Sequence, residues 1–117
     1  MGTSLDDLSA FPDEVKYEMG YALHVAQVGL KHESARPLRG FGGASTLEIV
    51  SDHDGDTFRA VYTVRFKGAV YVLHAFQKKS KKGIETPKEE LEIVRRRLKA
   101  AEEHYAEWSK SYGKKSN

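Results

Sequence analysis

The fold is decided by residues Thr57 to Arg97, which read TFRAVYTVRFKGAVYVLHAFQKKSKKGIETPKEELEIVRRR. The first part alternates β-branched and aromatic residues, which is typical of strands, and Lys67-Gly68 predicts a tight turn between two of them. The last part begins with the capping box TPKE at 86–89 and continues with an apolar residue every three or four positions. The stretch therefore predicts strand, turn, strand, basic loop and helix.

The flanking sequence completes an α+β fold in one domain, residues 1–117. Ser4 is typical of a helix N-cap, Pro12 of the start of a second helix and Gly29 of its end, so residues 1–30 predict a helical hairpin. Residues 31–45 are expected to be irregular, and residues 46–52 to form a strand before the Asp54-Gly55 turn. We expect a small twisted antiparallel sheet of three to four strands, a C-terminal helix of about 23 residues and a disordered tail over 113–117.

Charge is strongly segregated along the chain, although the net charge is only +2. Residues 1–56 carry four Lys or Arg against ten Asp or Glu, whereas residues 57–82 carry seven Lys or Arg and no acid. Positive charges gathered on one hairpin and its following loop repel one another, and such a segment usually binds a polyanion. The segregation predicts RNA binding through Arg65, Lys67, Lys81 and Lys82.

Composition excludes several classes of protein. The chain has no cysteine, which rules out disulfides and thiolate metal sites and fits a reducing cytoplasm. No N-terminal apolar run resembles a signal peptide, and no segment reaches the ~20 apolar residues of a membrane span. We therefore expect a cytoplasmic protein with no membrane partner.

A two-residue turn at Lys67-Gly68 would place Val61 opposite His74 and Arg59 opposite Phe76. Because side chains alternate, each face of the hairpin then has a defined membership. One face carries Arg59, Val61, Thr63, Arg65, Val70, Val72, His74, Phe76 and Lys78. The other carries Phe58, Ala60, Tyr62, Val64, Phe66, Tyr71, Leu73 and Ala75. We expect the second, wholly apolar face to form the principal core and Arg59 on the first face to be half-exposed.

The first face offers the groups that RNA cleavage needs. A loop at His53–Asp56 would place Glu48 in one row with Val61 and His74, with Arg59 diagonal to both ends. The guanidinium of Arg59 matches phosphate oxygens, and His74, with an unperturbed pKa of ~6.5, can move a proton near neutral pH. The candidate catalytic residues are Arg59, His74, Lys78 and Lys79.

Each of these assignments has a structural alternative. Glu48 either orients His74 through water or forms a cross-strand ion pair with Arg59. His74 either moves a proton or fills space between Val72 and Phe76. The lysine-rich loop either binds phosphate or is simply solvated.

The segment from Arg59 to Glu90, and above all LHAFQKK at 73–79, resembles the phage-derived branch of the RelE/HigB-like toxins of type II toxin–antitoxin systems. The likeness covers most of residues 5–98. It implies a RelE-like fold and an endoribonuclease that cleaves mRNA on the translating ribosome. It also implies a cognate antitoxin, with a helix-turn-helix DNA-binding domain, that restrains the toxin.

The resemblance further implies a reaction without metal or cofactor, in which the ribose 2′-OH attacks the scissile phosphate and leaves a cyclic phosphate. It places phosphate contacts at Arg59, Lys78 and Lys79 and matches His74 to the histidine of this branch. The chain departs from the family in two ways. Relatives usually carry a strand before the short first helix, whereas Ser4-Leu5 is already expected to be helical here, which would leave a sheet edge open. The tyrosine that assists catalysis in some relatives has no clear counterpart, Tyr105 and Tyr112 being weak candidates.

Two other functions compete with the ribonuclease. The alternative is a non-catalytic RNA- or ribosome-binding module that inhibits translation with the same basic face. A third is a protein-binding module whose long helix docks a partner. The first two predict salt-sensitive RNA binding, and only the ribonuclease predicts cleavage.

Overall fold

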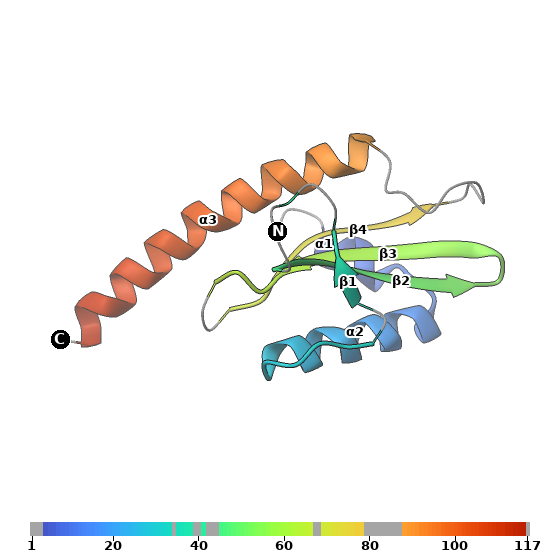
Figure 1. Ribbon diagram of the computed structural model, residues 1–117, viewed down its shortest axis with the longest axis horizontal. Helices are drawn as coiled ribbons and strands as arrows, with labels where there is room; N and C mark the ends of the chain where they lie inside the picture. Colours follow the sequence, from blue (N-terminus) through green and yellow to red (C-terminus); the bar gives the residue numbers. More distant parts are fainter. Residues whose placement is uncertain are drawn as a thin grey trace.

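The computed structural model describes residues 4–33, 35–38, 41, 45–66, 69–78 and 88–116, with the side chains of Lys78 and of 109–116 left out. Its elements, in chain order, are α1 (Ser4–Ser9), α2 (Asp13–Gln27), β1 (Ala35–Pro37), β2 (Thr46–His53), β3 (Asp56–Thr63), β4 (Tyr71–Lys78) and α3 (Lys88–Ser116). Figure 1 shows α2 on one side of the sheet and α3 on the other. The predicted α+β fold is confirmed, with a four-stranded antiparallel sheet.

The N-terminal helical hairpin forms as its capping residues predict, with one difference. α2 begins directly after Pro12 and ends in a Schellman motif, in which Gly29 donates to the Ala26 carbonyl and Leu30 to the Val25 carbonyl. Gly29 takes a positive φ of 87°, which explains the glycine. Ser4 differs, because its buried hydroxyl donates to the Val72 carbonyl on β4 at 2.9 Å. This bond ties α1 to the sheet.

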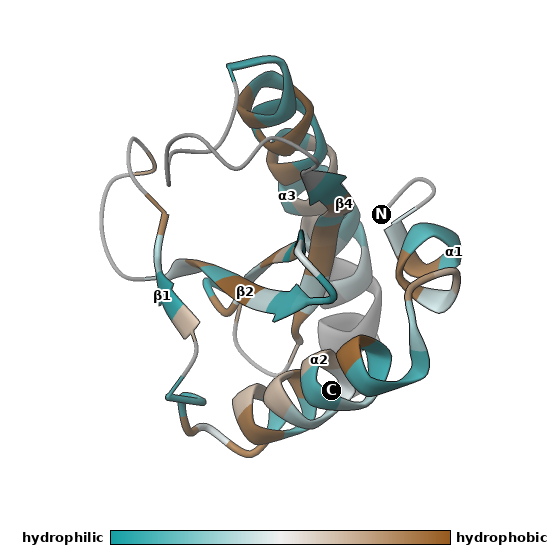
Figure 2. Ribbon diagram, turned by 90° about the vertical axis from the view of Figure 1, so that its right-hand side faces the viewer, coloured by the Kyte–Doolittle hydropathy of each residue, from teal (hydrophilic) through white to brown (hydrophobic). Residues whose placement is uncertain are grey.

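The strand order is β1-β2-β3-β4, so β1 and β4 form the two edges. β1 lies inside residues 31–45, and the prediction that this whole segment is irregular was therefore wrong. A strand of three residues ending in Pro37 is too short for alternation to be recognised, and proline is compatible with an edge position. Figure 2 shows β4 at the opposite edge of the sheet, near both α1 and α3.

The β2–β3 hairpin has the predicted register. Glu48 lies opposite Val61, and His53 opposite Asp56. Asp54 and Gly55 both have positive φ, at 51° and 84°, as a two-residue type I′ turn requires. The Asp54-Gly55 signal therefore fixed the pairing of these strands.

The β3–β4 pair follows the predicted register only up to Val61. Val61 lies opposite His74, but Tyr62 lies opposite Val72, so Leu73 is an extra residue in a β-bulge. Leu73 consequently packs in the same cluster as Val61, whereas the regular hairpin put it on the opposite face. The Lys67-Gly68 turn itself lies outside the described residues.

Two apolar clusters cover the two faces of the sheet. One joins α1 and α2 to the sheet and contains Leu8, Phe11, Val15, Met19, Ala22, Ala26, Ala35, Leu47, Ile49, Phe58, Ala60, Tyr62 and Ala75. The other joins α3 to the sheet and contains Leu38, Phe41, Val61, Leu73, Val94, Leu98 and Ala101. The face that carries Arg59 and His74 is thus covered by α3 as well.

α3 is a helix of 29 residues, longer than the predicted 23, and it runs into the stretch predicted as a tail. Its second half is held to the sheet by aromatic contacts: the rings of Tyr105 and Phe66 stack at 5.0 Å, and the Tyr71 hydroxyl lies 2.8 Å from His104 Nδ1. Burial and the neighbouring Tyr105 raise the pKa of Tyr71 above its ordinary value. No helix in the described part of the chain is long and apolar enough to cross a membrane.

Candidate functional site

The predicted polar row exists, and it lies beneath α3. β2, β3 and β4 bring Glu48, Val61 and His74 side by side, as their registers require. All three residues are buried, with exposed fractions of 3%, 0% and 6%. A charged or titratable group at such depth needs a partner, because desolvation of an unpaired charge is costly.

The Arg59 guanidinium finds that partner in Glu48. Arg59 is 3% exposed, and its Nη1 donates to Glu48 Oε1 at 3.0 Å. Arg36 on β1 approaches the same oxygen with its Nε at 3.8 Å from the exposed edge. The prediction that the Arg59 side chain is half-exposed was therefore wrong, because the alternation of side chains along a strand does not show that α3 covers this face. Of the two roles left open for Glu48, the cross-strand ion pair is the one observed.

His74 is held by two charged residues of α3. Its Nε2 lies 2.5 Å from Glu90 Oε2, and its Nδ1 lies 3.2 Å from Arg97 Nη1. A guanidinium can only donate, so Nδ1 accepts and Nε2 carries the proton that is donated to Glu90. The Phe76 ring stacks on the imidazole at 5.0 Å. These contacts fix both the orientation and the tautomer of His74.

The β-bulge explains how β4 presents this site. Leu73 and His74 are consecutive, yet Leu73 packs with the α3 cluster and His74 contacts Glu90 and Arg97 of α3. Arg97 Nη1 also donates to the Leu73 carbonyl at 3.1 Å. The extra residue thus brings two neighbouring side chains of the strand against one helix.

A hollow of about 670 Å³ opens beside His74 and Glu90. Its lining comes from α1, from the corner before α2, from the start of β3, from β4 and from the first turn of α3: Asp7, Ala10, Phe11, Pro12, Asp56, Phe58, His74, Ala75, Phe76, Gln77 and Glu90. A slightly larger hollow lies near the end of α2, where Lys31 is the one titratable group in the described lining. Since proton transfer needs paired titratable groups, the hollow at His74 is the candidate site.

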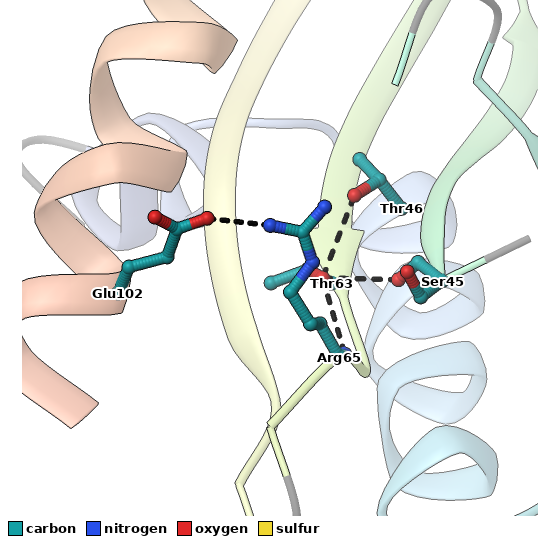
Figure 3. A network of polar contacts seen from close by, with 5 residues as sticks. All are labelled: Ser45, Thr46, Thr63, Arg65 and Glu102. Carbon is teal, nitrogen blue, oxygen red and sulfur yellow. Dashed lines mark hydrogen bonds and ion pairs between the residues drawn. The ribbon is translucent and has the colours of Figure 1, made fainter. Parts of the chain in front are cut away.

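The basic residues predicted to bind RNA are only partly placed. Arg65 lies two residues beyond the end of β3, and Figure 3 shows its guanidinium turned toward Glu102 of α3. Arg65 Nη1 donates to Glu102 Oε1 at 2.5 Å. The Arg65 amide donates to Thr63 Oγ1, and Thr63 donates to the Ser45 carbonyl, which anchors this segment. Lys78 ends β4 opposite Thr57.

Other predicted site residues lie outside what the structure describes. They are Lys67, Lys79, Lys81 and Lys82, together with the side chains of Lys78 and Tyr112. Tyr105 is described, is half-buried between Phe66 and Trp108, and is not in the described lining of the hollow at His74. Tyr105 is thus no part of the site at His74.

Glu90 and Arg97 were missed by the sequence analysis. They lie four positions before and three positions after Val94, which places them on the buried stripe of α3. Charged residues inside an apolar stripe usually meet a buried polar group, so this spacing was a usable signal. Among the described residues, no group of three His, Asp or Glu could hold a metal ion.

Comparison with known proteins places the chain in a family. No curated protein matches it significantly. A family model, described as phage-derived protein Gp49-like (DUF891), matches residues 6–99, which include every described residue of the site at His74. This family is one of RelE/HigB-like toxins, in agreement with the resemblance in the sequence. The chain therefore belongs to the Gp49-like family of phage-derived proteins.

Proposed function

We propose that this chain is the toxin of a type II toxin–antitoxin system and an endoribonuclease that cleaves mRNA on the ribosome. Membership of the Gp49-like family supports the toxin assignment. The observation that carries the ribonuclease assignment is the His74–Glu90 pair, which lines a hollow next to the strand that leads into the basic segment 78–82.

The proposed reaction needs proton transfer and positive charge. The ribose 2′-oxygen attacks phosphorus and loses its proton, while the bond from phosphorus to the 5′-oxygen breaks and that oxygen gains a proton. The products are a 2′,3′-cyclic phosphate and a 5′-hydroxyl, and no water is consumed. Catalysis therefore requires a base, an acid and cations near the phosphate.

The side chains of the site match these roles. His74 and Glu90 form the proton-transfer pair, because both line the hollow and share one hydrogen bond. Arg97 positions the imidazole by donating to Nδ1. Lys78 and Lys79 are the proposed phosphate contacts. Arg59, buried against Glu48, is better suited to support the strand row than to contact the substrate.

A non-catalytic RNA- or ribosome-binding module is the second candidate. The contacts of His74 favour this candidate, because both ring nitrogens already have hydrogen-bond partners. A histidine with a purely structural role would make the same contacts. The two candidates share the basic segment and differ in cleavage alone.

The test is inducible expression followed by mapping of new mRNA 5′ ends. Wild type should arrest growth and generate 5′-hydroxyl ends within messages, and His74→Gln should lose them. His53→Gln is the matched control, because His53 lies on the β2–β3 turn beside Glu14 and Asp54. Growth arrest without new ends would favour the binding module. Lack of arrest by the folded wild-type protein would contradict both candidates.

A further inference from the structure

The hollow beside His74 follows the edge of β4 and does not lie over one face of the sheet. Four consecutive residues, from His74 to Gln77, line it. Consecutive side chains of a strand point to opposite faces, so one hollow touches all four only where it runs along the strand edge. β4 is the last strand of the sheet, and no described strand pairs with its outer side. The main chain of β4 therefore borders the hollow.

The beginning of this edge is already closed by side chains. Ser4 donates to the Val72 carbonyl and Arg97 to the Leu73 carbonyl. Within the described part of the chain, no such bond reaches the outer edge between Ala75 and Gln77. The open part, from His74 to Gln77, has room for about four residues of extended chain, ~13 Å. An unpaired strand edge of this kind is a template for another strand.

The charges around this edge select the occupant. Asp7, Asp56 and Glu90 line the hollow, and no lysine or arginine does so among the described residues. Three carboxylates favour positive side chains in a segment bound along this edge. Ala10, Phe11 and Pro12 supply an apolar wall opposite the strand. The edge of β4 therefore fits a basic peptide, whereas the lysines proposed to contact phosphate belong to the segment that follows the strand.

We propose that this edge groove, formed by Asp7, Asp56, His74–Gln77 and Glu90, binds an extended basic segment of a protein partner as a fifth strand. Main-chain hydrogen bonds to β4 supply affinity, and lysine or arginine side chains of the segment pair with the three carboxylates. The bound segment covers His74 and Glu90 and so blocks cleavage. That consequence, with the antitoxin as the partner, rests on the proposed function, whereas binding itself does not.

The probe is the protein encoded by the reading frame next to that of this chain, purified alone, together with overlapping 12-residue synthetic peptides that span it. Hydrogen exchange of the full chain is compared with and without the probe. We expect the outward amides of Ala75–Gln77 to gain protection. We also expect one basic peptide to reproduce this protection.

Charge reversal in the groove provides the matched comparison. Asp7→Lys should weaken binding of the peptide roughly tenfold, whereas Asp6→Lys, which alters the same first turn of α1 without lining the groove, should change it less than about twofold. Gln77→Lys, on the exposed side of β4, should weaken binding as well and does not depend on α1.

Several outcomes would overturn the inference. They are the absence of any complex, a complex that leaves Ala75–Gln77 unprotected, and equal effects of Asp6→Lys and Asp7→Lys. Protection of these amides by a 2′-deoxy-substituted RNA oligonucleotide instead of the peptide would assign the groove to the substrate. None of these readouts measures cleavage, so loss of the ribonuclease hypothesis would leave the binding result standing.

Discussion

The Tyr62 hydroxyl is buried without a hydrogen-bond partner among the described residues, although its ring packs fully in the α1–α2 cluster. An unsatisfied buried polar group costs roughly 1–3 kcal/mol. Tyr62→Phe keeps the ring and removes the oxygen, so we expect the free energy of unfolding to rise by about 1 kcal/mol in urea titrations at pH 7. Tyr17→Phe, on an exposed ring, should change it by less than ~0.5 kcal/mol.

The same residue should make stability depend on alkaline pH. Burial raises the pKa of Tyr62 above its ordinary value of 10.0, so the unfolded chain releases this proton first. The stability that wild type gains from keeping Tyr62 protonated is fully present below the pKa of the unfolded chain. It is lost as the pH rises through that pKa toward the higher pKa of the folded state. The advantage of Tyr62→Phe over wild type should therefore be larger at pH 11 than at pH 9. A constant difference would show that Tyr62 does not titrate differently on folding.

The buried ion pair makes Arg59 a structural residue. Removing one partner of a buried pair typically costs about 3–5 kcal/mol, because the other charge stays buried. We expect Arg59→Ala to lower the free energy of unfolding by an amount in this range, less any stabilisation that Arg36 provides by pairing with Glu48. Arg36→Ala, which removes a half-exposed side chain, should lower it by less than about 1 kcal/mol. Equal urea midpoints for the two variants would contradict the burial of Arg59.

Among the elements, α2 has one glycine inside it and one just beyond its C-terminal end, and their replacement should have opposite effects. Gly20 lies inside the helix and Gly29 at its end with a positive φ, and a Cβ would meet no atom within 4 Å at either position. Gly20→Ala should therefore stabilise the fold by about 0.5–1 kcal/mol, whereas Gly29→Ala should destabilise it by about 1–2 kcal/mol. Thermal unfolding of both variants measures this. Stabilisation by both would mean that the Schellman motif is not formed in solution.

The elements that could be predicted are those with a local chemical signal. Asp54-Gly55 predicted the β2–β3 register, and Pro12 and Gly29 the bounds of α2. The bulge at Leu73 has no such signal, because every residue around it has strand composition. Its cause lies in tertiary contacts, since Leu73 fills the cluster under α3 and its carbonyl accepts from Arg97. A local pattern cannot predict a register shift that a distant helix selects.

At the scale of the whole molecule, the candidate site depends on the packing of α3 against the sheet. The row of Glu48, Val61 and His74 followed from strand register, but Glu90 and Arg97 come from a helix whose position the sequence did not define. The predicted open basic face is therefore a covered face, with a hollow at its β4 edge. The lysines of the segment after β4 remain a sequence prediction.

The role of His74 can be separated from that of the lysines by measuring rate and affinity independently. If His74 moves a proton, His74→Gln should slow single-turnover cleavage on programmed ribosomes by ~10²-fold or more and leave ribosome affinity unchanged. If Lys79 stabilises charge that develops on the phosphate, Lys79→Ala should also lower the rate more than the affinity, by ~10²–10³-fold.

Arg97→Lys is the informative companion to His74→Gln. It keeps the positive charge but loses the planar donor at Nδ1 and at the Leu73 carbonyl. If the tautomer of His74 matters, this variant should lower the cleavage rate and shift its pH profile while the fold, checked by thermal unfolding, persists. A fully active His74→Gln would remove the imidazole from the chemistry. Glu90, the other proton-transfer group that lines the hollow, would then be the remaining candidate base.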